Sequence, residues 1–257
     1  MKNIERRKFI NSAIGVIGLA NLRFKVFDQS DINEINPYQS AGTVKLKGRL
    51  DSKIKHWDII TIGNLSRNRY WGESEERPLR GAICTCTVIS GDNFHIIVDP
   101  SLADEAAMTN ELKRRTGLTP DDIDVVFITH QHGDHVAGIK HFQKARWIAG
   151  SDVAYGLNKS SQFPKTFEPA GSSLFEAIDI IPTPGHTPDH QSLRFDNNGL
   201  SIVIAGDSVA TFDFWNDRAM YYNVMDMAES KRSMEKIDSI ADLIVPGHDN
   251  CFLNLQL

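Results

Sequence analysis

Four short apolar stretches of this chain each run into a histidine or an aspartate. These pairs of stretch and polar residue are 124–129 with His130, 177–181 with His186, 200–205 with Asp207, and 241–245 with His248. Short runs rich in valine and isoleucine predict buried strands, and the glycine before three of the polar residues permits a sharp turn. We therefore expect four strand ends to meet at one edge and to bring distant polar side chains together.

The remaining pattern predicts further strands and a few helices. Residues 82–90 and 94–99 form an expected hairpin around the turn-rich Gly91-Asp92-Asn93. Other strands are expected at 57–62, 146–149 and 191–195, and helices at 104–115, 138–143 and 228–240. Hairpins followed by alternating strands and helices indicate a mixed α/β (α+β) fold.

The N-terminal pattern differs from the rest. Residues 1–12 contain Lys2, Arg6, Arg7 and Lys8, and residues 13–20 are an apolar run too short for a stable membrane span. Residues 6–10 resemble a twin-arginine export signature. We predict a signal segment at 1–28, an irregular arm at 29–52 and one domain at 53–257, with export to a bacterial periplasm. If the segment is not a signal, a cytoplasmic location is expected.

Composition is that of an ordinary soluble enzyme. The chain has 257 residues, 41% hydrophobic and 24% charged, with a net charge of −5. A nucleic-acid binder more often has a basic surface. We therefore expect a small-molecule substrate and no nucleic-acid partner, while the oligomeric state is not predicted.

The densest chemistry lies directly after the first of the four strands. His130, His132, Asp134 and His135 fall within residues 129–135. Neutral imidazole nitrogens and carboxylate oxygens are ligands that zinc and similar divalent ions favour. Packing gives no reason for such a concentration, so the sequence predicts a metal site.

The complete set of His130, His132, Asp134, His135, His186, Asp207 and His248 resembles the metallo-β-lactamase superfamily of binuclear metallohydrolases. Within it, the stretches at 80–82, 205–208 and 242–248 look most similar to lactonases and to proteins like metallo-β-lactamase domain-containing protein 1. The resemblance implies a four-layered αββα sandwich with the metal site along the shared edge of two sheets.

The resemblance also implies a role for each ligand. His130, His132 and His186 would hold one metal ion, Asp134, His135 and His248 a second, and Asp207 would bridge the two. The ions would be divalent, with zinc expected and manganese or iron as alternatives. A hydroxide between the ions would be the nucleophile, and Asp134 would also act catalytically by orienting it or moving a proton.

An aspartate at position 207 resembles lactonases, thioesterases and phosphodiesterases more than true β-lactamases. The expected function is cleavage of an ester-like bond, with a lactone or small ester as first choice. The alternatives are a phosphodiesterase or nuclease, a β-lactamase or thioesterase, and a non-catalytic binding protein of the same fold.

Further residues are candidates for supporting roles. Asp99 follows the second strand of the hairpin, where it either supports the metal ligands or caps a turn. His190 is expected to support the ligands or the structure rather than to bind metal. Aromatic residues on flanking loops are candidate walls of a substrate pocket, and these are Tyr70, Trp71, Trp215, Tyr221 and Tyr222.

Overall fold

The computed structural model describes residues 46–74, 76–160, 162–219 and 224–255. The predicted signal segment and the arm up to residue 45 lie outside the described residues, so export stays a prediction. The chain divides into two compact units, Met1–Leu46 and Lys47–Leu257, and the fold described here is that of the second. Among the described residues, no helix is long and apolar enough to cross a membrane.

The first sheet has six strands in the order β1-β2-β3-β4-β5-β6. Their bounds are β1 Ile54–Thr61, β2 Cys86–Gly91, β3 His95–Val98, β4 Val125–Ile128, β5 Arg146–Ala149 and β6 Phe167–Pro169. The hairpin of β2 and β3 is antiparallel, as predicted, and β3 to β6 run parallel. The β2 strand begins later than expected, because Ile83 pairs only in an isolated bridge with Asn64.

The second sheet has six strands in the order β12-β11-β10-β9-β8-β7. Their bounds are β7 Ser173–Leu174, β8 Ile178–Pro182, β9 Gln191–Asn197, β10 Leu200–Gly206, β11 Leu243–Pro246 and β12 Phe252–Leu253. Both β8 and β10 are antiparallel to β9, and β11 is parallel to β10. The strands β8, β10 and β11 therefore end at the same edge of this sheet, while the first of the predicted set, β4, belongs to the other sheet.

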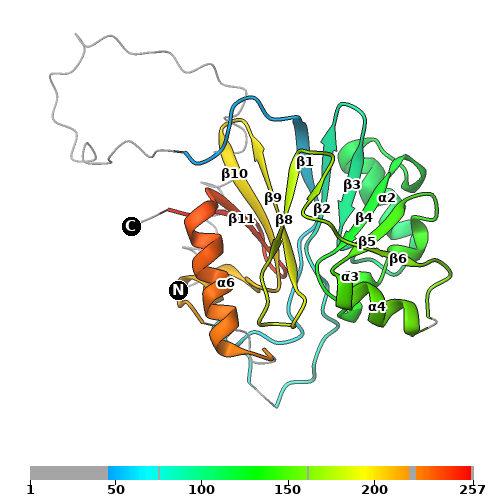
Figure 1. The fold of residues 1–257 in the computed structure, drawn as a ribbon. Helices are drawn as coiled ribbons and strands as arrows, with labels where there is room; N and C mark the ends of the chain where they lie inside the picture. The colour runs from blue at the N-terminus through cyan, green and yellow to red at the C-terminus, as the bar shows by residue number, and fades with distance from the viewer. Residues whose placement is uncertain (1–45, 75, 161, 220–223, 256–257) are drawn as a thin grey trace, which may run out of the picture. The chain divides into compact units, whose positions relative to one another are not determined.

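The two sheets pack face to face, with helices outside each (Figure 1). On β4, Val125 and Phe127 face the second sheet, whereas Val126 and Ile128 face the helices α2 (Glu105–Thr116) and α4 (Ser151–Lys159). On the far side, Met234 and Ile237 of α6 (Met227–Ile240) cover β10 and β11. Since both faces of β4 are buried, its unbroken apolar run is explained. The layers are the predicted αββα sandwich.

The two long predicted helices form, with the expected ends. Asp104 caps α2 by accepting a hydrogen bond from the Ala107 amide, and Gly117 ends it in the left-handed region, at φ 78°. Asp226 caps α6 through the amides of Ala228 and Glu229. In both helices an aspartate stands just before the helical apolar pattern, which is a local sequence signal for a helix start.

Several short elements differ from the prediction. A helix was expected at 138–143, and the structure has α3 at Gly133–Val136 and a 3-10 turn at Ile139–His141 instead. The helices α4 and α5 (Phe212–Asn216) were not predicted. The N-cap of α4 is Gly150, which has no capping side chain, and the Asp152 amide donates instead to Asp189 Oδ2 at 2.8 Å. Such a cap from a distant loop leaves no local signal. Two other 3-10 turns are Arg69–Trp71 and Pro120–Asp122.

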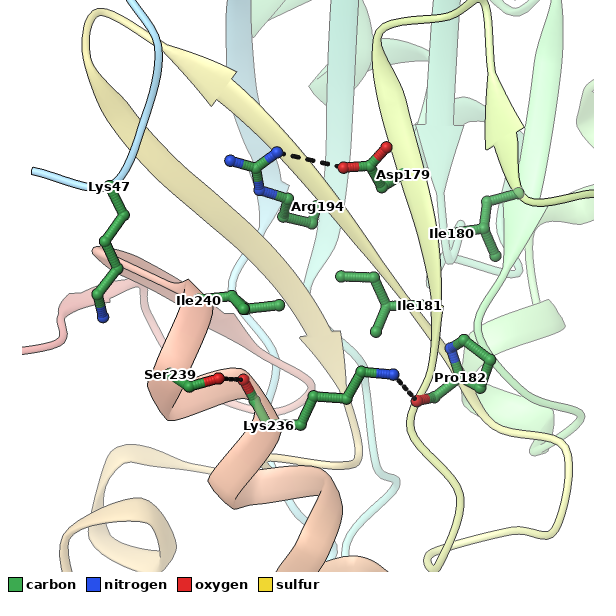
Figure 2. Close-up of a pocket in the computed structure, with 9 residues that line it drawn as sticks. All are labelled: Lys47, Asp179, Ile180, Ile181, Pro182, Arg194, Lys236, Ser239 and Ile240. Atoms are coloured by element: carbon green, nitrogen blue, oxygen red, sulfur yellow. Dashed lines mark hydrogen bonds and ion pairs between the residues drawn. The ribbon is translucent and has the colours of Figure 1, made fainter.

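A groove of about 510 Å³ lies on the outer face of the second sheet, between β8, β9 and α6 (Figure 2). Its cationic side chains are already engaged: Arg194 pairs with Asp179 at 3.2 Å, and Lys236 donates to the Pro182 carbonyl at 3.2 Å. None of the predicted site residues that the structure describes lines it.

Candidate metal centre

The turns after β4, β8, β10 and β11 bring the seven predicted ligands together at the shared edge of the two sheets. Their ligand atoms fall into two groups, each within 4.8 Å. The first group contains His130, His132, His186 and Asp207, and the second contains Asp134, His135 and His248. The resemblance implied the same two sets of three, with Asp207 as a bridge between them rather than a member of the first, and metal binding by these residues stays a prediction.

In the first group, three ring nitrogens converge. Nε2 of His130 and Nε2 of His186 each lie 3.0 Å from Nδ1 of His132. Ligand atoms about 2.0–2.1 Å from a tetrahedral zinc ion lie about 3.3 Å from one another. The spacing of the three nitrogens therefore suits a shared cation.

In the second group, two imidazoles and a carboxylate face one another. His248 Nε2 lies 3.5 Å from Asp134 Oδ2, and His135 Nε2 lies 4.0 Å from the same oxygen. Asp134 belongs to the short helix α3, while His248 follows β11 of the other sheet. This group therefore closes only when both sheets are packed together.

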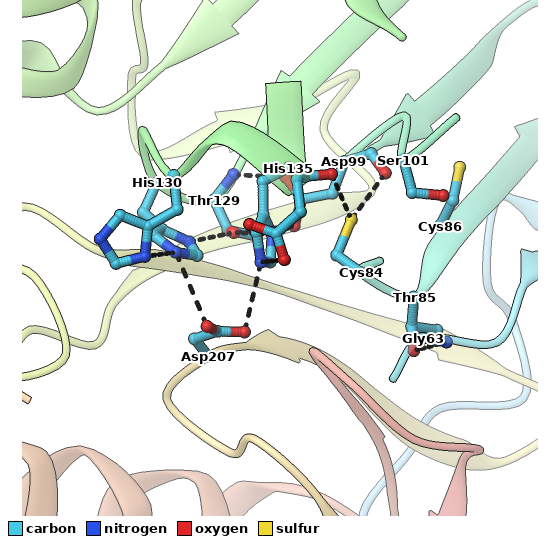
Figure 3. Close-up of polar contacts among 12 residues, drawn as sticks. Gly63, Cys84, Thr85, Cys86, Asp99, Ser101, Thr129, His130, His135 and Asp207 are labelled. Atoms are coloured by element: carbon cyan, nitrogen blue, oxygen red, sulfur yellow. Dashed lines mark hydrogen bonds and ion pairs between the residues drawn. The ribbon is translucent and has the colours of Figure 1, made fainter. Parts of the chain in front are cut away.

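Asp207 stands between the groups, and its two oxygens face different ones (Figure 3). Oδ2 lies 3.2 Å from His186 Nε2 and 3.8 Å from His130 Nε2. Oδ1 lies 3.2 Å from His248 Nε2 and 3.3 Å from His135 Nε2. A carboxylate divided in this way has the geometry of a bridge between two cations.

Hydrogen bonds behind the ligands fix which ring nitrogen faces the centre. The Thr129 amide and hydroxyl both donate to the Asp99 carboxylate, at 2.8 and 2.7 Å. Asp99 Oδ2 also accepts from His135 Nδ1 at 2.8 Å, which leaves the lone pair of His135 Nε2 facing the centre. The Thr129 hydroxyl oxygen lies 3.1 Å from His130 Nδ1, so it accepts from that nitrogen and exposes Nε2.

Backbone carbonyls perform the same task for His248. Its Nδ1 lies 3.0 Å from the Ile83 carbonyl oxygen and 3.2 Å from that of Asn64, so Nδ1 carries the proton. Thr85 ties the neighbouring backbone, because its hydroxyl donates to the Asp249 carbonyl at 2.8 Å. The segment that leads into β2 therefore supports His248, which lies far away in sequence.

Cys84 lies directly behind the second group. Its thiol donates to the carbonyl oxygens of Asp134, at 3.2 Å, and Asp99, at 3.3 Å (Figure 3). Burial raises the pKa of this thiol to about 12. It is therefore a neutral donor that fixes the backbone of Asp134 and Asp99.

Burial and neighbouring charges set the protonation of the centre. Burial lowers the pKa of His186 to about 4 and holds that of His130 well below its usual range. Burial alone would raise the pKa of Asp207, but the facing His248 and His135 lower it well below the usual range. The first group thus presents neutral imidazoles and an ionised carboxylate, the forms that bind metal.

Two atoms at the middle of the centre are buried without a hydrogen-bond partner among the described residues. They are His135 Nε2 and Asp207 Oδ1. Leaving such polar atoms unsatisfied is costly in a buried site. Two divalent cations held by nitrogen and oxygen donors would satisfy both, so the residues present fit the metal pair that the family resemblance implied.

The structure separates the predicted pocket aromatics. Trp215 is only 5% exposed and packs with Val203 and Met234 between the second sheet and α6, and its predicted pocket role stays a prediction. Tyr70 packs edge-on against Phe214, with ring centroids 4.9 Å apart, and Trp71 lies under the guanidinium of Arg80 at 5.3 Å. A pocket role for Tyr70 and Trp71 stays a prediction.

Tyr221 and Tyr222 lie outside the described residues. Thr129, Cys84 and the Ile83 carbonyl were not predicted as supports of the metal centre. For Thr129, the hydroxyl next to the first ligand was an available signal. A backbone carbonyl leaves none, because any residue supplies it.

Comparisons with known proteins agree with this geometry. Residues 79–248 match the model of the Metallo-beta-lactamase superfamily. Metallo-beta-lactamase domain-containing protein 1 of Xenopus laevis is 30% identical over 138 residues, which are 51% of this chain and 56% of that protein. The chain thus spans about half the length of the curated relatives of that name.

Another relative aligns over more of its length. The N-acyl homoserine lactonase AttM of Rhizobium radiobacter is 26% identical over 232 residues, covering 73% of this chain and 88% of the lactonase. A solved N-acyl homoserine lactone hydrolase, with its product bound at the catalytic metal centre, shares the fold. Its TM-score is 0.60 at 18% identity, over 77% of this chain and 94% of the hydrolase.

Proposed function

Because this chain belongs to the metallo-beta-lactamase superfamily, we propose that it is a metal-dependent hydrolase that cleaves an ester-like bond, with a lactone or small ester as substrate. One observation carries the proposal: Asp207 presents one oxygen to each of two ligand groups. A binding protein without chemistry has no need for a carboxylate divided between two complete groups.

The chain itself supplies the ligands for two divalent ions, with zinc as the expected ion. When bound, such a pair lowers the pKa of a water molecule and polarises a carbonyl oxygen. Asp207 offsets the repulsion between the two positive charges, since its carboxylate is shared. The hydrogen bonds that the imidazoles donate to Asp99, Thr129 and the Ile83 carbonyl keep the rings oriented before substrate arrives.

Asp134 is the residue best placed to move a proton. Its side chain is 18% exposed, whereas that of Asp207 is 5% exposed. A carboxylate that reaches solvent can accept a proton from water and deliver it to the leaving alkoxide. Asp134 thus combines metal binding with general acid–base catalysis in the proposed reaction.

The lactone as first substrate is supported by the relatives. A lactonase aligns over most of its own length with this chain. The aspartate at position 207, which the resemblance associates with lactonases, thioesterases and phosphodiesterases, argues only against a true β-lactamase. The name of the AttM relative identifies its substrates as N-acyl homoserine lactones. An acyl lactone is therefore the first compound to test.

The test is turnover of a substrate panel by zinc-loaded protein. The panel contains an N-acyl homoserine lactone, an aryl ester, a thioester, a β-lactam and a phosphodiester. We expect the lactone or ester to turn over fastest, with loss on chelation and recovery on adding zinc. The variant Asp207→Ala should lose at least about a hundredfold in kcat/KM.

A matched control is Asp213→Ala, which removes an aspartate in the first turn of the neighbouring helix α5. It should keep turnover close to that of the original chain. Preferred turnover of the phosphodiester, β-lactam or thioester would replace the ester assignment. No turnover of any compound by protein carrying two zinc equivalents would favour a binding protein.

A further inference from the structure

His190 is completely buried and belongs to neither ligand group. We propose that it is a positioning residue, which orients the bridging Asp207 by accepting a hydrogen bond from the Asp207 backbone amide. The inference deepens the proposed function and rests on it, because orientation of Asp207 matters only if that carboxylate binds metal.

The protonation of His190 follows from its neighbours. The Asp207 amide donates to His190 Nε2 at 3.1 Å, so Nε2 carries a lone pair and no proton. The proton of the neutral ring is therefore on Nδ1, which lies 2.9 Å from the Thr183 hydroxyl and 3.1 Å from that of Ser208. Both ring nitrogens are occupied, which explains why this histidine is not a ligand although its ring centroid lies 5.1 Å from that of His130.

A series of hydroxyl groups fixes the direction of each hydrogen bond around His190. With the Thr183 oxygen accepting from His190, its proton points to the Ser192 oxygen at 2.7 Å. Ser192 in turn donates to the Ala205 carbonyl at 3.1 Å, and Ser208 donates to the Thr183 carbonyl at 2.7 Å. Every member of this buried network is satisfied, so it specifies one geometry.

The turn before Asp207 leaves no room for another arrangement. Gly206 has φ 51°, in the left-handed region. A Cβ at this position would lie 2.8 Å from His190 Nε2 and 2.8 Å from the Thr129 hydroxyl oxygen. The turn is thus pressed between His190 and Thr129, which itself supports His130. The position of the bridging carboxylate depends on this contact.

Two near-isosteric substitutions separate the roles of the two ring nitrogens. In His190→Gln the side-chain oxygen can take the place of Nε2 and accept from the Asp207 amide. In His190→Asn the side-chain NH2 can take the place of Nδ1 and donate to Thr183, but nothing reaches the Asp207 amide. Asparagine is one methylene smaller than glutamine, so a purely structural role predicts that zinc affinity falls only in step with the loss of stability in each variant. A loss of affinity in His190→Asn beyond its loss of stability therefore marks the contact with the Asp207 amide.

The first measurement is zinc affinity of the full chain by competition with a chromophoric chelator, with thermal unfolding of each variant in parallel. We expect His190→Asn to lose about 10–100-fold in affinity, and His190→Gln to stay within about threefold. Equal losses in the two variants, or an unchanged His190→Asn, would overturn the inference. This readout does not involve turnover, so it is distinct from a failure of the proposed hydrolase function.

The second measurement reads the tautomer directly. Long-range 1H–15N correlation of the 15N-labelled, zinc-loaded chain should show His190 protonated on Nδ1, and the signal should vanish in His190→Gln. Protonation on Nε2 would contradict the hydrogen bond from Asp207 and with it the inference. If only His190→Asn fails to fold, the tautomer of the original chain still decides.

Discussion

Asp99 Oδ2 lies 2.8 Å from His135 Nδ1, which joins the end of β3 to a ligand of the second group. The same carboxylate accepts from the amide and the hydroxyl of Thr129. Three donors on one buried carboxylate cannot all be satisfied by an amide side chain, which has a single acceptor oxygen.

The first prediction concerns Asp99→Asn. It should weaken zinc binding by about 10–100-fold and lower the free energy of unfolding by about 1–3 kcal/mol. Chelator competition and urea unfolding measure the two effects. Asp104→Asn is the control, because Asp104 is an N-cap and asparagine caps equally well. Unchanged zinc affinity in Asp99→Asn would show that this carboxylate only caps a turn.

The second prediction concerns metal stoichiometry. Removing a ligand from one group alone, as in His186→Ala or His248→Ala, should leave about one zinc ion bound per chain. Asp207→Ala should reduce binding at both positions, since its oxygens lie 3.2 Å from a nitrogen of each group. Elemental analysis after gel filtration gives the counts. Two ions retained by Asp207→Ala would contradict a bridging role.

The third prediction compares two glycines that both have positive φ. Gly206→Ala adds a Cβ that lies 2.8 Å from His190 Nε2, whereas at Gly117 a Cβ meets nothing within 4 Å. The left-handed backbone costs about 1–2 kcal/mol in each variant. Gly206→Ala should therefore destabilise more than Gly117→Ala and should also reduce zinc affinity. Urea unfolding of the pair measures the difference, and equal losses would mean that the turn yields freely.

The fourth prediction concerns Cys251, which is 5% exposed and whose pKa burial raises to about 11. An acid with a raised pKa stays protonated below that value, so the reactive thiolate is scarce at about pH 8. Iodoacetamide should label this residue in folded protein far more slowly than after unfolding in urea. Peptide mass spectrometry follows the label. Labelling at equal rates in both states would contradict burial of the thiol.

The fifth prediction concerns the N-terminal segment outside the described residues. We propose that Arg6 and Arg7 direct export of folded protein, because they precede a short apolar run. In a bacterial host, replacing both with lysine should abolish periplasmic accumulation, while Lys2→Gln should leave it unchanged. Fractionation and immunoblotting measure the outcome. Equal export of the double variant would remove the twin-arginine interpretation.

The long elements were predictable because their signals are local. The uninterrupted apolar run at 125–128 and the Asp104 cap each act within a few residues. The ligand set was readable for another reason: imidazole and carboxylate at strand ends have few alternative uses. Metal binding by these residues stays a prediction, although the structure brings all seven together.

The parts that were not predicted depend on distant partners. The sequence around Trp215 resembles an exposed loop, but in the structure the second sheet and α6 enclose its side chain. Residues 82–85 have the apolar pattern of a strand, but they bond to a loop and to the end of the second sheet instead of extending β2, with an isolated bridge between Ile83 and Asn64. In both cases tertiary packing decides what the local pattern leaves open.

Asp189 caps the helix α4 from a loop 37 positions further along the chain. The helix packs on the first sheet, whereas the loop joins β8 and β9 of the second. A ribosome must therefore add β7, β8 and the loop after them before this helix start finds its partner. Neither half is a self-sufficient module, and we expect a protein cut between them to misassemble rather than to yield two working pieces.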